Sequence, residues 1–75
     1  MNQREDAWLA DRLAGVEAEI SRLDDRSPTL NHQVSDPSQP EHEQAKWTAL
    51  WDLRQRALLI EERDAILAAR ARIAP

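Results

Sequence analysis

The sequence predicts an all-α protein, an antiparallel helical hairpin that dimerises into a four-helix bundle. Three observations predict this class. Apolar residues recur with heptad spacing in two segments, a proline-containing segment separates them, and the second helical segment is longer than the first. The 75 residues form one domain, residues 1–75. A chain of this length buries too little apolar surface to be comfortably stable alone.

The first helix is expected over residues 3–26. Asn2 and Glu5 have the spacing of a capping box. Gly15 costs a helix about 1 kcal/mol, and beside a heptad seam its usual reason is the close approach of a neighbouring helix. The seam has alternating spacings of four and three and consists of Leu9, Leu13, Val16, Ile20 and Leu23.

A loop is expected over residues 27–38. Pro28 disfavours helical geometry at Ser27, and the residues that follow are rich in proline, serine, asparagine and aspartate. The loop would be long, because helix connections typically have about 2 to 8 residues. Leu30 and Val34 either fold back over the end of the bundle or are incidental apolar residues of a mobile loop.

The second helix is expected over residues 39–73. Ser38 and Glu41 form a second capping box, with Pro40 inside the first turn. The helix would be roughly 50 Å long against roughly 35 Å for the first. Antiparallel pairing would therefore leave residues 62–75 beyond the end of the first helix.

The second helix is apolar on more than one side, and one neighbouring helix covers only one side. Its stripes are, first, Leu50, Leu53, Ala57, Ile60, Leu67 and Ala71, broken by Asp64; second, Leu59, Ile66 and Ile73; and third, Trp47, Trp51, Leu58 and Ala65. A second copy of the chain would cover the rest, because two-fold dimers are the commonest oligomers. The predicted dimer interface consists of Leu50, Leu53, Ile60, Ile66, Leu67 and Ile73.

Charge is divided unevenly along the chain, whose net charge is −4. Residues 1–45 hold four arginines against ten acids, and residues 46–75 hold Lys46 and five arginines against four acids. This division favours antiparallel pairing within or between chains. The acidic balance argues against nucleic acid as a partner. The absence of cysteine excludes disulfides and thiolate zinc sites.

Two groups of residues are candidates for binding another protein. Trp47 and Trp51, one turn apart, form either an exposed aromatic platform or packing residues of the core or dimer interface. Trp8 is expected to pack. Arg56, Arg63 and Arg70 recur every seven residues. They form either a groove for an acidic partner or flanking charges that pair with the acids of the first helix, with Asp52 or with a neighbouring chain.

No motif points to catalysis. Asp64 interrupts an apolar stripe and is expected to pair with an arginine of the facing helix. His32 and His42 have no partners at metal-ligand spacing, and the chain lacks a glycine-rich phosphate loop or nucleophile elbow. We therefore expect no cofactor, metal or small-molecule substrate. No run reaches the ~18 apolar residues of a membrane span, and no secretory signal is apparent, so a cytoplasmic location is expected.

The segment Glu41-His42, followed by Leu50-Trp51-Asp52-Leu53-Arg54-Gln55-Arg56-Ala57, resembles the second helix of a family of small uncharacterised bacterial helical-hairpin proteins. That family carries an acid-His pair and a Trp-Asp-Leu-Leu-Arg-Gln-Arg signature. The resemblance covers about a quarter of the chain. The chain lacks one leucine of the signature, has its acid-His pair at the start of the second helix, and lacks the polar C-terminal tail. The resemblance implies a hairpin fold and no activity.

The resulting hypothesis is a small non-enzymatic adaptor or inhibitor that binds another protein as a homodimeric helical bundle, of the regulatory type that phages also encode. The alternative is a purely structural coiled-coil protein that assembles with itself and has no separate partner. An enzyme would need a carboxylate or histidine site formed only at the dimer interface.

Overall fold

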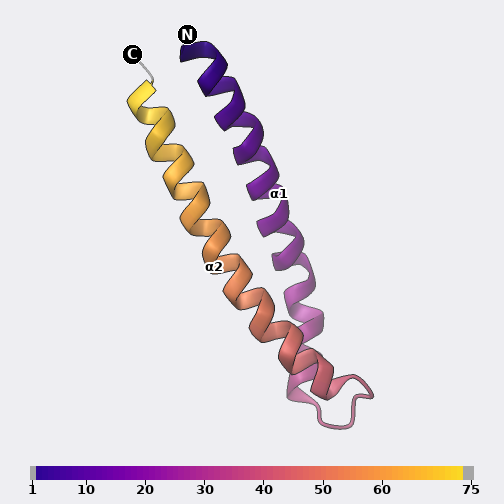
Figure 1. Ribbon diagram of the computed structural model, residues 1–75. Coiled ribbons are helices and arrows are strands. Elements are labelled where there is room, and N and C mark those ends of the chain that lie inside the picture. Colours follow the sequence, from indigo (N-terminus) through magenta and orange to yellow (C-terminus); the bar gives the residue numbers. More distant parts are fainter. Residues whose placement is uncertain (1, 74–75) are drawn as a thin grey trace.

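The computed structural model describes the backbone of residues 2–73 and the side chains of residues 3–73. It contains two helices, α1 (Asn2–Ser35) and α2 (His42–Ile73). The helices run antiparallel, with both termini at one end and the connection at the other (Figure 1). The hairpin is elongated, with Cα extents of 57 × 14 × 13 Å. The predicted all-helical hairpin is confirmed.

The sequence predicted that the first helix ends near residue 26. Helix α1 instead continues through Pro28 to Ser35. The apolar seam explains why, because its alternating spacing continues through Ser27 to Leu30 and Val34. Leu30 and Val34 are half-buried, whereas Pro28 is exposed. Helix α1 changes direction in its last third (Figure 1), as expected where a proline removes one backbone hydrogen bond. Packing against α2 therefore outweighs the local preference of Pro28.

The connection comprises residues 36–41 rather than the expected 27–38. Asp36 organises it, because its Oδ1 atom accepts hydrogen bonds from the Ser38 backbone N–H at 3.0 Å and the Ser38 hydroxyl at 2.6 Å. These bonds hold the pKa of Asp36 below its ordinary value. Ser38 therefore belongs to the turn and does not cap the helix. Helix α2 begins at His42, with a bond from the Ala45 N–H to the Glu41 carbonyl.

The predicted length mismatch is wrong. The two helices have 34 and 32 residues, roughly 51 and 48 Å at 1.5 Å per residue. Asp6, near the start of α1, pairs with Arg70, near the end of α2. Residues 62–73 thus lie beside α1 and do not project beyond it. The earlier expectation failed because it ended α1 about nine residues too early.

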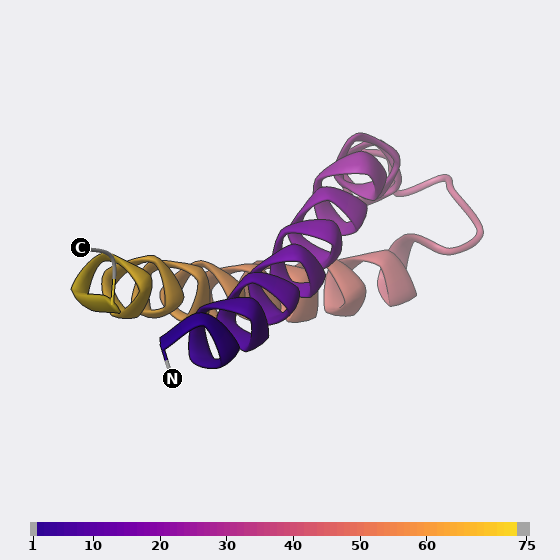
Figure 2. The same cartoon turned by 90° about the horizontal axis from the view of Figure 1, so that it is seen from above.

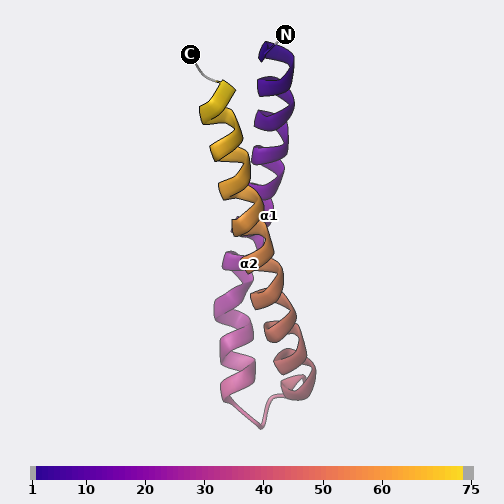
Figure 3. The same cartoon turned by 60° about the vertical axis from the view of Figure 1, so that its left-hand side comes forward.

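The hydrophobic core lies in the half of the hairpin that contains the termini. Leu13, Val16 and Ile20 of α1 form one buried cluster with Ile66 of α2, and Leu9, Leu59 and Ile60 pack against this cluster. Nearer the connection, Leu23 and Ala45 are the other buried apolar residues among those described. The helices cross at an angle, as seen from above in Figure 2 and from the side in Figure 3. The core is therefore a narrow line of side chains between two helices.

Two smaller expectations concern α1. Beside Gly15, no atom lies within 4 Å of where a Cβ would stand. The close approach of a helix expected there is therefore not made within the hairpin. The Asn2 side chain, half of the expected Asn2–Glu5 capping box, lies outside the described side chains. Helix α1 nevertheless begins at Asn2.

Candidate interaction surface

Ion pairs join α1 to α2 between Asp6 and Arg26 of α1, and two of the four run from an acid of α1 to an arginine of α2, the sense that the uneven charge distribution favours. Arg56 Nε donates to Asp24 Oδ1 at 2.7 Å, and Arg70 Nε donates to Asp6 Oδ1 at 2.9 Å. These hydrogen bonds raise the pKa of both arginines. The complete set of inter-helix pairs among the described residues is Arg12–Glu62, Arg26–Asp52, Arg56–Asp24 and Arg70–Asp6.

The predicted arginine stripe, Arg56, Arg63 and Arg70, serves mainly to pair with acids of the same chain. Arg56 and Arg70 pair with acids of α1, which confirms the flanking-charge interpretation for these two. Arg63 pairs with its neighbour Asp64 on α2. Asp64 is exposed and does not pair with an arginine of the facing helix. The stripe is therefore largely occupied within the hairpin.

Among the described residues, the buried charged side chain is that of Asp52, which sequence reasoning did not single out as a core position. Its exposure is 8%, and it lies in the seven-residue series Ala45, Asp52, Leu59, Ile66 and Ile73 that faces α1. Both its carboxylate oxygens accept hydrogen bonds from the Arg26 guanidinium, Nε to Oδ2 at 2.5 Å. This bidentate contact raises the pKa of Arg26. The seven-residue series was the signal that could have located it.

We expect the two partners of this pair to respond oppositely to substitution. Arg26→Met leaves a buried carboxylate unpaired and should lower the unfolding temperature, because an uncompensated buried charge is strongly destabilising. Asp52→Leu restores an apolar residue to the core series, and Arg26, with a side chain 40% exposed, can turn to water. This change should stabilise by about 1 kcal/mol. Thermal unfolding followed by circular dichroism measures both, and equal destabilisation by both variants would contradict the expectation.

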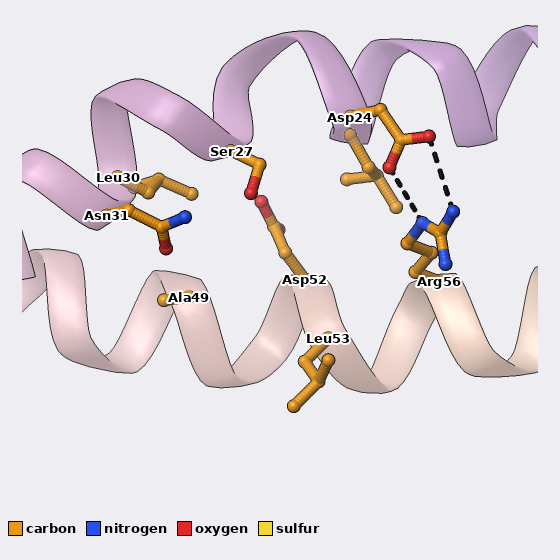
Figure 4. Close-up of a pocket in the computed structure, with 9 residues that line it drawn as sticks. Asp24, Ser27, Leu30, Asn31, Ala49, Asp52, Leu53 and Arg56 are labelled. Atoms are coloured by element: carbon orange, nitrogen blue, oxygen red, sulfur yellow. Dashed lines mark hydrogen bonds and ion pairs between the residues drawn. The ribbon is translucent and has the colours of Figure 1, made fainter.

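Three clefts follow the seam on the connection side of the core. The cleft in Figure 4 has a volume of about 210 Å³ and lies between Asp24, Ser27 and Leu30 of α1 and Asp52 and Arg56 of α2. The other two measure about 290 and 240 Å³. Ligand pockets usually measure roughly 300–1,000 Å³. These clefts are therefore smaller than typical ligand pockets.

The most unusual surface is the side of α2 that faces away from α1. Trp47 is 71% exposed, Trp51 61% and Leu53 69%. Leu53 points away from α1 (Figure 4). We define the outer face of α2 by its large exposed apolar residues, Trp47, Leu50, Trp51, Leu53, Leu58 and Leu67. Within one chain the two tryptophans are therefore an exposed platform and not core residues.

The predicted interface residues divide into two groups. Leu50, Leu53 and Leu67 are exposed on the outer face. Ile66 belongs to the core of the hairpin and Ile60 packs against that core. Ile73 is half-buried. The assignment of Ile66 to a dimer interface depended on the overhang and is corrected here, because Ile66 is covered by α1 of its own chain. Trp8, expected to pack, is 66% exposed.

The exposed area is large for the size of the chain. The accessible surface is 5824 Å², whereas a folded monomer of this mass exposes about 4,700 Å². The excess, roughly 1,100 Å², is comparable with the ~800 Å² that each partner buries in a standard protein–protein interface. A hairpin alone therefore leaves uncovered about as much surface as one interface occupies.

Within residues 2–73, no group of three or more His, Asp or Glu side chains is arranged to hold a metal ion. In the same range neither helix combines the length and apolar character needed to cross a membrane. The outer face of α2 is thus the most prominent feature of the described surface.

Comparisons with protein-family models, with curated proteins and with solved structures found no match to this chain.

Proposed function

We propose that the protein is a small non-enzymatic adaptor or inhibitor that works as a homodimeric helical bundle and binds another protein. The observation that carries this proposal is the outer face of α2, where three leucines and two tryptophans are at least half exposed. Contiguous apolar patches on small proteins mark interaction sites. Tryptophan is also enriched among the residues that dominate binding energy. A cytoplasmic location is part of the proposal.

Two features favour a protein as the partner. The inter-helix arginines are already paired with acids, so they offer few free cations to an anionic ligand. The exposed side chains form one side of a helix of 32 residues, and an apolar helix side is commonly covered by another helix. A purely structural protein that only assembles with itself is the alternative. It differs in predicting no further binding once the copies have associated.

The concentration dependence of thermal unfolding tests the homodimer. For a protein stabilised by its second copy, the midpoint should rise with protein concentration by mass action. Circular dichroism melts over a hundredfold range of concentration measure this. A midpoint that stays constant over the whole range would contradict the homodimer.

A capture experiment tests binding to another protein. Wild type is compared with Trp47→Ala/Trp51→Ala, using Trp8→Ala as a matched control because Trp8 is equally exposed but lies on α1. Specific loss of a captured protein from the double variant, with helicity unchanged, supports the adaptor, and the molar mass of the variant shows whether the same two tryptophans also hold the second copy. Equal capture by all three proteins would contradict a role for this face, and no capture by wild type would favour the structural alternative.

A further inference from the structure

The outer face of α2 has two unlike halves. The seven-residue series through Asp52 faces α1, and the residues two positions after each of its members lie about 200° around the helix, opposite α1. The first half of this face carries Trp47 and Leu50, which are large and exposed. The second half carries small residues at the corresponding places, Ala68 and Ala71, both exposed. Large side chains at one end of the face thus match small ones at the other.

The charges on the same face are divided in the same way. Arg54 is in the first half, and Glu61 and Asp64 are in the second half. Among residues 3–73, Arg54 and Glu61 take part in no ion pair, and Asp64 pairs with the adjacent Arg63 alone. In contrast, the charges beside α1 are paired across the helices. A cation and two acids therefore remain available on the side away from α1.

We propose that a second copy of the chain packs on this face with its α2 antiparallel, so that the two α2 helices lie back to back. A two-fold axis at the level of Leu59 brings Trp47 opposite Ala71 of the second copy and Leu50 opposite its Ala68. The same axis brings Arg54 opposite Asp64 of the second copy, and each of these contacts occurs twice. This inference rests on the proposed homodimer and specifies its geometry.

The flanks of the face fit the same axis. When two copies of one helix pack antiparallel, the side chains on one flank of the contact face lie beside side chains from the same flank of the other copy. Leu53 then lies near Leu67 of the second copy on one flank, and Trp51 lies near its Ala65 on the other. Both Leu53 and Leu67 were predicted as interface residues, and both are substantially exposed in the hairpin. Five of the six large exposed side chains that define this face thus gain an apolar neighbour from the second copy.

A parallel arrangement of the same two faces is unfavourable. It would place Trp47 against Trp47 and Arg54 against Arg54, while Ala68 and Ala71 would meet alanines and leave gaps. Like charges in apposition oppose association, and poorly filled interfaces lose packing. The antiparallel arrangement avoids both. It also makes α2 an interior helix, covered on one side by α1 and on the other by its copy, which accounts for apolar residues around its circumference.

A charge exchange tests the geometry. Arg54→Asp and Asp64→Arg should each weaken the dimer about tenfold or more, because each brings like charges together twice. The double variant Arg54→Asp/Asp64→Arg should recover most of the affinity. The two positions are ten residues, or roughly 15 Å, apart on one helix, so recovery cannot arise within a chain. Arg4→Asp, a change of an exposed arginine of α1 that takes part in no ion pair among residues 3–73, is the matched control and should leave the affinity unchanged.

Sedimentation equilibrium gives the dissociation constants, and circular dichroism checks that each variant keeps its helices. Weakening by both single variants with recovery in the double variant supports the antiparallel dimer. Dimers that are unaffected by the single variants, or that stay weak in the double variant, overturn this geometry while leaving the homodimer intact. A wild type that is monomeric at every concentration overturns the proposed homodimer itself.

Discussion

Ile66→Ala should largely unfold the hairpin. Ile66 is 6% exposed and belongs to the buried cluster that also contains Leu13, Val16 and Ile20. Truncating a buried isoleucine to alanine costs about 2–5 kcal/mol, and a domain of this size has only a few kcal/mol of stability to lose. The core contains few other side chains that could move into the cavity. Chemical denaturation followed by circular dichroism measures the loss.

Leu67→Ala is the matched control for this prediction. Leu67 adjoins Ile66 in the sequence but is 46% exposed. Its truncation should cost much less in dilute protein, because no buried cavity forms in the hairpin. Any further effect of Leu67→Ala should grow with protein concentration if a second copy covers this residue. Equal losses for the two variants in dilute protein would contradict the position of α1 over Ile66.

Pro28→Ala should stabilise the protein by up to about 3 kcal/mol, the difference between proline and alanine inside a helix. Alanine restores the backbone N–H that can bond to the Asp24 carbonyl, and position 28 is exposed, so no packing is lost. The bend of α1 should also diminish. The rise in thermal unfolding midpoint measures the gain.

The connection supplies the control for the proline variant. Pro37 lies between the helices, within residues 36–41. Pro37→Ala should give no gain and a small loss, because it frees the unfolded chain without adding a helical bond. If Pro28→Ala behaved like Pro37→Ala, the chain at Pro28 would be a loop in solution.

Much of the fold could be predicted from the apolar pattern. The seam from Leu9 to Leu23 correctly indicated a helix and its buried side, and three of its residues form the core with Ile66. The end of α1 was missed because Pro28 was given more weight than the continued spacing to Leu30 and Val34. At this position the preference of proline against helix opposed the packing of α1 on α2. A sequence shows such a local preference more clearly than it shows tertiary packing.

The register between the helices could not be predicted, because it depends on where α1 ends. With residues 36–41 as the connection, Asp52 lies opposite Arg26, and Ile66 belongs to the buried cluster with Leu13 and Val16 of α1. With the longer loop that the sequence predicted, residues 62–75, including Ile66, would have projected beyond α1. Trp47 and Trp51 are exposed because neither belongs to the seven-residue series through Asp52 that faces α1. Most of the corrected predictions therefore resulted from one error, the position at which α1 ends.

The central claim is that a second copy covers the outer face of α2, and the molar mass in solution tests it most directly. Light scattering at micromolar concentration should give twice the chain mass of 8.6 kDa. Wild-type protein that keeps its helices and elutes with the mass of one chain would contradict the claim.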